Sequence, residues 1–280
     1  MSGSEGLGGR FSRGALYAYV GLVQILLLAP IAAITLGSLT TTQYVVFPPV
    51  GLTLQWYSQV FDRPEMIDSF GLSLGIAGLA STVAGLVGLA VSIALIRYRT
   101  RMNVVLWLLV VSSMMMPSVV LGFGFLQTYT RIGIGGTVFA LIAGHIVLVT
   151  PYAVTLIGAG LRLVNPTLEE AARSLGASRL RTFRHVTLPL VSWSLVVGWG
   201  LAFLVSFSDA SISIFLNTPR VVTLPVRIFD ALRFSPLDPQ LTAVASGLVI
   251  VTLIVLFASA RFINFDRLTQ QSTKDKTEQG

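Results

Sequence analysis

Long apolar runs alternate with short polar segments along this chain of 280 residues. An α-helix needs about 20 mostly apolar residues to cross a bilayer, and several of the runs reach that length. We therefore predict an all-α, polytopic membrane protein with six transmembrane helices. The predicted spans cover residues 16–36, 70–96, 104–127, 136–161, 191–207 and 241–263.

The first run raises the alternative of a secretory signal peptide, because Arg10 and Arg13 precede it. A signal peptide has an apolar region of roughly 7–15 residues followed by a small-residue cleavage pattern. The run here is longer, and residues 37–40 do not show that pattern. We therefore expect the first helix to be retained as a transmembrane span.

The amino-acid composition supports a membrane protein and excludes every kind of site that depends on cysteine. Only 11% of the residues are charged and 54% are hydrophobic, with a mean hydropathy of +0.80. A soluble domain has about a quarter of its residues charged. The chain has no cysteine, which excludes disulfides, a thiol nucleophile and cysteine-based metal ligation. We expect no metal and no cofactor.

The net charge of +7 would suggest a nucleic-acid partner if the protein were soluble. With the N-terminus inside and six spans, 14 of the 19 basic residues fall on inner segments. The five on outer segments are Arg63, Arg131, Arg220, Arg227 and Arg233. The positive-inside rule therefore places both termini in the cytoplasm, and no nucleic acid is needed to explain the charge.

The spans divide the chain into four expected regions. They are a cytoplasmic N-terminal segment (1–15), a first helix with its outer loop (16–68), a transmembrane core (69–263) with the inner loop 165–189, and a cytoplasmic tail (264–280). The polar tail is expected to be disordered. The outer segment 208–240 is partly apolar, so we expect a helix or a re-entrant piece there.

The inner loop between the fourth and fifth spans carries the signals of a short helix. Asn165 suits an N-cap, Pro166 the first helical position and Gly176 a left-handed end. Glu169 and Glu170 fall in the first turns, where acidic side chains suit the helix dipole. An apolar stripe at i, i+3, i+4 and i+7 is formed by Leu168, Ala171, Ala172 and Leu175. We predict an amphipathic helix on the cytoplasmic side, too short to cross a membrane.

The segment 178–186 after this helix is basic, with Arg179, Arg181, Arg184 and His185. In one interpretation these side chains reach anionic lipid headgroups. In the other, the helix and the basic segment bind a cytoplasmic partner.

The spacing in this loop resembles a known motif. Glu170-Ala171-Ala172, Gly176, Val186 and Leu188-Pro189 are similar to the EAA loop of binding-protein-dependent ABC importer permeases of the type I, MetI-like fold, with Val186 in place of the usual isoleucine. The resemblance covers about residues 69–263 and favours partner binding over lipid contact. It implies that the helix binds a cleft of an ATPase subunit and transmits its closure. The implied coupling residues are Glu169, Glu170, Ala171, Ala172, Gly176, Arg179, Leu188 and Pro189.

Several other stretches resemble the polyamine branch of this family, the spermidine and putrescine permeases. They are Phe47-Pro48-Pro49, Trp56-Tyr57, residues 145–152, residues 224–229 and Ser206-Phe207-Ser208-Asp209. Polyamine permeases tend to have two adjacent acids where this chain has Ser208 and Asp209. The resemblance implies import of a polyamine, with an opine, an amino-acid derivative or an iron complex as the alternative solute.

Candidate residues of the solute pathway lie at two places. The first is Ser206, Phe207, Ser208 and Asp209 at the end of the fifth span. An acid at membrane depth is costly, so Asp209 either attracts a cationic amine or is an interfacial acid in contact with water. The second is Met116 and Pro117 in the third span, where proline can act as a hinge. Methionine there either lines a gate or packs in the core. We expect His145 to be a packed, hydrogen-bonded residue.

The chain is not expected to be an enzyme. It has no Walker A motif for ATP and no paired catalytic groups within the spans, so an intramembrane enzyme is disfavoured. A passive channel would leave the EAA loop without a role. The resemblance implies these partners in the inner membrane: two ABC ATPase subunits, a second permease of the same or a different sequence, an extracytoplasmic solute-binding protein, and membrane lipid.

Overall fold

The computed structural model describes residues 7–98, 101–234 and 238–262, with side chains for 14–98, 101–234 and 238–253. Over these ranges its regular secondary structure is helical, with one isolated β-bridge between Thr218 and Val221 and with loops such as residues 38–54. The chain divides into two compact units, residues 1–63 with 231–280 and residues 64–230. The predicted cytoplasmic tail, 264–280, lies outside the described residues.

The first unit contains α1 (Leu7–Gly37), α2 (Gln55–Val60) and α12 (Pro239–Phe262). The Tyr57 hydroxyl on α2 lies 2.7 Å from Ser38 Oγ and 2.7 Å from Ser246 Oγ. Polar groups in an apolar setting are stabilised when they are paired, so this hydroxyl cluster fixes how α2 packs on α12. The apolar side chains of α1 are mostly exposed, as expected for a helix that other molecules or lipid surround.

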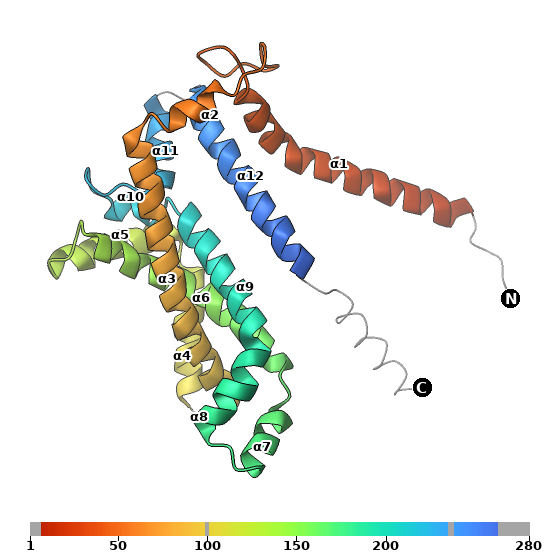
Figure 1. Cartoon of the computed structure of the whole chain (residues 1–280), viewed down its shortest axis with the longest axis vertical. Coiled ribbons are helices and arrows are strands. Elements are labelled where there is room, and N and C mark those ends of the chain that lie inside the picture. Colours follow the sequence, from red (N-terminus) through yellow and green to blue (C-terminus); the bar gives the residue numbers. More distant parts are fainter. Residues whose placement is uncertain (1–6, 99–100, 235–237, 263–280) are drawn as a thin grey trace. The chain divides into compact units, whose positions relative to one another are not determined.

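The second unit is built around α3 (Pro64–Arg97), α6 (Val138–Leu163) and α9 (Leu188–Ser208), which lie side by side in Figure 1. Their facing sides supply the apolar core. Buried members of this core include Ile76, Ala84, Leu141, Val149, Ile157, Val191 and Ala202.

Small residues bring α3 and α6 into close backbone contact. A Cβ atom at Gly88 would lie 2.9 Å from Ala153 Cβ and 3.1 Å from Val154 N. Beside it, Ser92 Oγ donates a hydrogen bond of 3.0 Å to the Val154 carbonyl. Membrane helices associate through packing and hydrogen bonds of this kind, because lipid supplies no hydrophobic force between them.

The predicted third span, 104–127, is interrupted at Pro117, the residue that was expected to act as a hinge. The chain forms α4 (Met102–Met115) and α5 (Ser118–Arg131), which are bent by 107° relative to each other. Met116 and Pro117 are both extended, with ψ of 132° and 131°. A residue before proline is driven out of the helical region, and Pro117 has no N–H to continue the ladder. The break is either a broken span or a re-entrant loop.

Four described helices are long and apolar enough to cross a membrane: Gly14–Gly37 within α1, α3, α6, and the continuous stretch Arg179–Ser208 that ends with α9. The α4–α5 pair adds a fifth if it counts as one span. α12 is apolar over Pro239–Leu253, the part whose side chains are described. These findings are compatible with six spans, and the location of both termini remains a prediction.

Two of the segments between spans contain short helices. The inner loop contains α7 (Pro166–Ser174), α8 (Arg179–Thr182) and a π-helical turn, η1 (Phe183–Thr187), that leads directly into α9. The π turn lies just before Pro189, whose missing N–H disrupts regular helical bonding. The predicted helical pieces in 208–240 are confirmed as α10 (Ser213–Leu216) and α11 (Leu224–Phe234).

Candidate functional site

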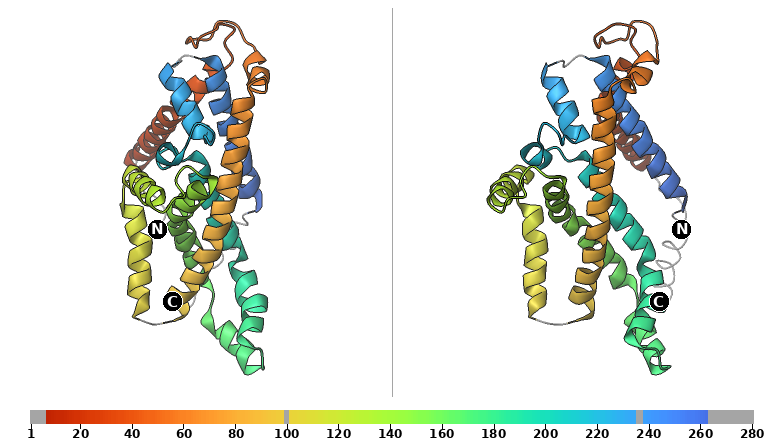
Figure 2. Two further views of the ribbon diagram at one scale, coloured as in Figure 1. Left: turned by 90° about the vertical axis from the view of Figure 1, so that its left-hand side faces the viewer. Right: turned by 60° about the vertical axis from the view of Figure 1, so that its left-hand side comes forward.

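The predicted amphipathic helix of the inner loop is confirmed as α7. The Asn165 side chain accepts a hydrogen bond of 3.0 Å from the Thr167 amide, which caps the helix, and Pro166 is its first residue. Gly176 has a φ of +88°, the left-handed conformation that ends a helix at glycine. In both views of Figure 2, α7 and α8 lie at one end of the second unit, near the last turn of α3.

The apolar stripe of α7 is not covered by the rest of the described chain. Leu168 is 49% exposed and Leu175 is 90% exposed. Ala171 is also exposed and Ala172 is half-buried, and none of the described residues of α7 is fully buried. An exposed apolar stripe flanked by charged side chains is available for contact with another molecule.

Glu169 is the residue that ties α7 to the bundle. Its Oε1 atom accepts hydrogen bonds from Arg97 Nε at 3.2 Å and from Thr187 Oγ1 at 3.0 Å. Arg97 Nη2 lies 3.1 Å from the same oxygen and also donates to the Val164 carbonyl at 3.1 Å. The Arg97 and Glu169 side chains are only 15% and 12% exposed. We call Glu169, Arg97 and Thr187 the Glu169 cluster.

The other coupling candidates lie around it. Glu170 and Arg179 line a cavity of about 250 Å³, together with Arg97 and Arg173. Leu188 is half-buried and packs on the apolar core, whereas Pro189 is exposed. The structure thus brings α7, α8 and the ends of α3 and α9 together, with Glu170 and Arg179 open to solvent.

The end of α9 is the second candidate region. Ser206 is buried, and its Oγ lies 2.8 Å from His145 Nδ1, while His145 Nε2 lies 3.1 Å from Ser213 Oγ. His145 is 1% exposed, so the expectation of a packed, hydrogen-bonded histidine is confirmed. One ring nitrogen donates and the other accepts, and this joins α6, α9 and α10. Ser206 is therefore committed to structure in this conformation.

Asp209 caps the short helix that follows it. Its Oδ2 atom accepts hydrogen bonds from the amides of Ile212 at 3.0 Å and Ser213 at 3.2 Å. The side chain is half-buried, so its second oxygen and its charge are not fully screened by water. Ser208 is exposed, and its hydroxyl donates to the Leu204 carbonyl at 2.8 Å.

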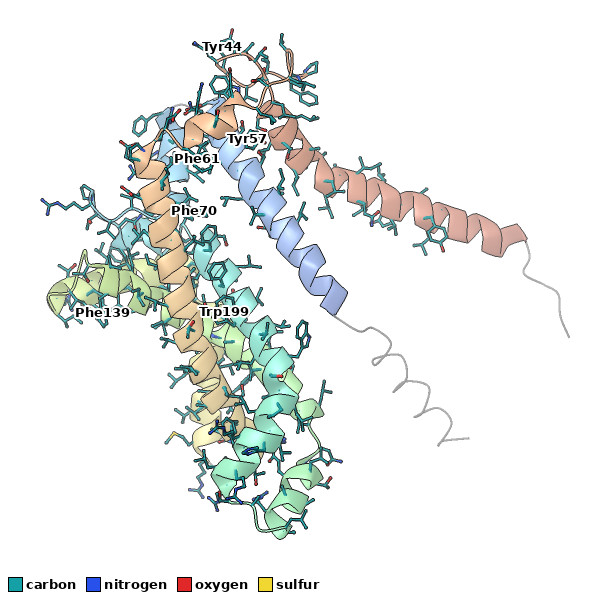
Figure 3. All side chains as sticks on the ribbon, in the orientation of Figure 1. Tyr44, Tyr57, Phe61, Phe70, Phe139 and Trp199 are labelled. Carbon is teal, nitrogen blue, oxygen red and sulfur yellow. The ribbon has the colours of Figure 1, made fainter. Side chains whose placement is uncertain are left out.

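Phe207 belongs to a row of aromatic side chains. Its ring stacks on Phe203 at 5.9 Å and meets Phe70 edge-on at 6.0 Å, and Phe203 stacks on Trp199 at 5.4 Å. Phe70 and Trp199, labelled in Figure 3, are the two ends of this row. Trp199 Nε1 donates to Thr82 Oγ1 at 3.1 Å. The row therefore packs α9 against α3.

Met116 and Pro117 are both exposed and form the break between α4 and α5. The break places α5 against α10, where a Cβ atom at Gly122 would lie 3.1 Å from Ile212 Cα. The sequence located this break, but it gave no sign that α5 would pack beside the segment that Asp209 caps.

Two functional candidates were missed by the sequence analysis. Arg97 counted there only as an inner positive charge, and Ser213 was part of a loop. The sequence signal for Arg97 was an arginine at the end of a long apolar run, with the acids Glu169 and Glu170 in the next inner loop. No pattern in the sequence selects Glu169 over the other acids as its partner.

The sequence comparisons bear on this arrangement directly. Residues 84–269, more than half of the chain, match the family of binding-protein-dependent transport system inner membrane components. The chain belongs to this permease family. It is accordingly an inner-membrane transport component, and not an enzyme by family.

Two similar relatives of the permease are from Escherichia coli K12. The spermidine/putrescine permease PotC is 29% identical over 255 residues, covering 90% of this chain and 93% of the relative. The putrescine permease PotI is 29% identical over 246 residues, covering 84% and 87%. A putative 2-aminoethylphosphonate permease, PhnV of Salmonella paratyphi A, is also 29% identical, covering 79% and 83%.

Solved ABC transporters have the same fold as this permease. A chain of a bacterial importer of the acidic polysaccharide alginate matches with a TM-score of 0.66 at 17% identity, covering 94% of this chain and all of the other. A chain of the MetNI methionine transporter, in an inward-facing conformation, matches with a TM-score of 0.61 at 18% identity, covering 70% and 94%. The expected MetI-like fold is confirmed.

Proposed function

We propose that this permease forms the solute pathway of an ATP-driven importer of polyamines such as spermidine or putrescine. A separate ATPase drives it through α7, an extracytoplasmic binding protein delivers the solute, and a second permease completes the pathway. The observation that carries the proposal is the exposed apolar stripe of α7 beside the ionic Glu169 cluster.

The ATPase side of the proposal follows from what α7 leaves exposed. Leu168 and Leu175 are both exposed, at 49% and 90%, and they flank the acidic residue Glu170. A partner with an apolar cleft and a nearby cation would bury the leucines and pair the acid. Since the chain has no Walker A motif, the energy for transport has to come from such a partner.

The proposal of a polyamine solute is supported by the charge of Asp209 and by the solutes for which the relatives are named. The two Escherichia coli relatives are named for spermidine and putrescine, which are organic cations. Asp209 supplies a half-buried negative charge at the end of α9. The relative named for 2-aminoethylphosphonate supports a second candidate, a small amine that also carries an anionic group.

The test is uptake by the reconstituted complex. The permease is co-expressed with its cognate ATPase and second permease, placed in liposomes, and supplied with loaded binding protein. Radiolabelled spermidine or putrescine is expected to accumulate on the ATPase side of the membrane, and only when ATP is present on that side. Accumulation of 2-aminoethylphosphonate instead would assign the second candidate. Solute flux that is independent of ATP would support a passive channel and contradict the proposal.

We expect Asp209→Asn to weaken uptake of a cationic solute without unfolding the permease. Asparagine retains an oxygen that can cap α10, so the substitution removes mainly the charge. The apparent KM for spermidine should rise about tenfold, equivalent to about 1.4 kcal/mol. The matched control is Asp230→Asn, an exposed acid on α11, which should leave KM unchanged. An unchanged KM for Asp209→Asn would mean that this carboxylate only caps α10.

A further inference from the structure

Arg97 connects three helices at one end of the second unit. It is the last residue of α3, where a cation also suits the helix dipole. Its Nη2 atom donates to the carbonyl of Val164, the residue that follows α6, at 3.1 Å. Its guanidinium also donates to Glu169 on α7 through Nε, at 3.2 Å. One side chain therefore links the ends of α3 and α6 to the helix that is proposed to bind the ATPase.

Glu169 makes the matching connection to α9. Thr187, the buried residue directly before α9, donates its hydroxyl to Glu169 Oε1 at 3.0 Å. The same oxygen receives the Arg97 donors, so a single carboxylate atom holds α3 and the start of α9 together. Charge-assisted hydrogen bonds of this kind are stronger and more directional than neutral ones.

Little else fixes α7 to the core. Of its nine described residues only Glu169 and Ala172 are half-buried, and the rest are exposed. The leucines that would anchor an ordinary amphipathic helix, Leu168 and Leu175, are exposed here. The strongest directional contacts between α7 and the helix bundle are therefore the hydrogen bonds of Glu169, and movement of α7 would act on the bundle through them.

We propose that the Glu169 cluster is the mechanical connection that passes movement of α7 to α3 and α9, with Arg97 as its positioning residue. This inference rests on the proposed function, because the movement originates in the ATPase. The apolar stripe and Glu170 contact the ATPase, and Glu169 contacts the ends of α3 and α9 in the helix bundle. The two adjacent glutamates thus have different roles: one faces outward to the ATPase, and the other faces inward to Arg97 and Thr187.

The test separates assembly from coupling. Arg97→Met, Glu169→Gln and Thr187→Val are each made in the full complex, which is reconstituted with ATPase and loaded binding protein. Arg97→Met and Glu169→Gln should each lower the number of solutes moved per ATP about tenfold, with the amount of bound ATPase unchanged. Thr187→Val removes one neutral donor and should give a smaller loss. Arg162→Met, an exposed arginine in the last turn of α6, is the matched control and should behave as wild type.

A double-mutant cycle decides whether Arg97 and Glu169 act as a unit. If they do, the variant with both substitutions should be no worse than either single variant, because the connection is already lost. Losses that multiply would mean that the two residues act separately and would overturn the proposal. Loss of bound ATPase in either single variant would also overturn it, since the residues would then serve assembly.

A second measurement follows the movement directly. The chain has no cysteine, so Ala90→Cys on α3 and Ser174→Cys on α7, both at exposed positions, can carry a pair of spin labels without background from the permease itself. The distance distribution between them should stay narrow with and without ATP, and Arg97→Met should broaden it. A distribution unchanged by Arg97→Met would contradict the proposal. If the wild-type complex shows no ATP-driven uptake, the proposed function fails; if it does and the variants stay coupled, only the connection fails.

Discussion

Replacing Glu170 with arginine is expected to uncouple solute uptake from ATP hydrolysis while leaving the permease folded. Glu170 is exposed on α7, so the substitution leaves in place the hydrogen bonds that Glu169 makes to the bundle. It does replace an acid with a cation in the lining of a cavity that Arg97, Arg173 and Arg179 also line. A fourth cation there repels a basic partner surface and removes the acid that would pair with it.

The measurement is uptake by the reconstituted complex together with the amount of bound ATPase. Uptake should fall by at least about tenfold, which corresponds to a loss of about 1.4 kcal/mol in the coupled state. Glu65→Arg makes the same change at an exposed position in the first turn of α3 and should leave uptake within about twofold of wild type, since a surface charge contributes little. Normal uptake by the Glu170→Arg complex would remove α7 as the coupling surface.

The second large effect is expected from Gly88→Ala in the helix pair at the centre of the second unit. The added Cβ would lie 2.9 Å from Ala153 Cβ and 3.1 Å from the Ala153 carbonyl carbon and from Val154 N. Backbone atoms cannot move aside as a flexible side chain can, so α3 and α6 have to separate. Overpacking of this kind costs about 1–3 kcal/mol. It should also lengthen the hydrogen bond that Ser92 donates to Val154 beside it.

Gly75→Ala is the matched control, because it makes the same change in the same helix. Among the described atoms, nothing lies within 4 Å of a Cβ built at Gly75. There the alanine should raise stability by about 0.5–1 kcal/mol through its better helix propensity. Unfolding of the purified permease by a denaturing detergent measures both: the midpoint should fall for Gly88→Ala and hold or rise for Gly75→Ala. Equal midpoints would show that α3 and α6 are not held together at Gly88.

Much of the fold could be predicted because local chemistry determines it. Length and hydropathy locate the long helices, since a bilayer of fixed thickness demands runs of that size. The bounds of α7 follow from Asn165, Pro166 and Gly176, each of which acts on its own backbone within a few residues. Local geometry at Pro117 also predicts where the helix breaks. It does not predict the angle of 107° between α4 and α5, because the packing of α5 determines its direction.

The candidate site shows the same division. The sequence identified Asp209 as an acid near the end of a span, but only the folded chain shows its carboxylate capping α10 through two amides. His145 was expected to be hydrogen-bonded, whereas its partners, Ser206 and Ser213, lie 61 and 68 residues away in the chain. Partners so distant leave no periodicity for a sequence pattern to detect.

By itself, the sequence determined that this protein is a helical membrane permease with a short amphipathic helix between two spans. Apolar run length, helix caps and the spacing of the EAA loop are properties of neighbouring residues, so they survive without tertiary structure. Only the tertiary structure decided that Glu169 and Glu170 differ in role. Arg97 and Glu169 are 72 residues apart, and their contact exists because the packing of α3, α6 and α9 brings the ends of those helices to one place.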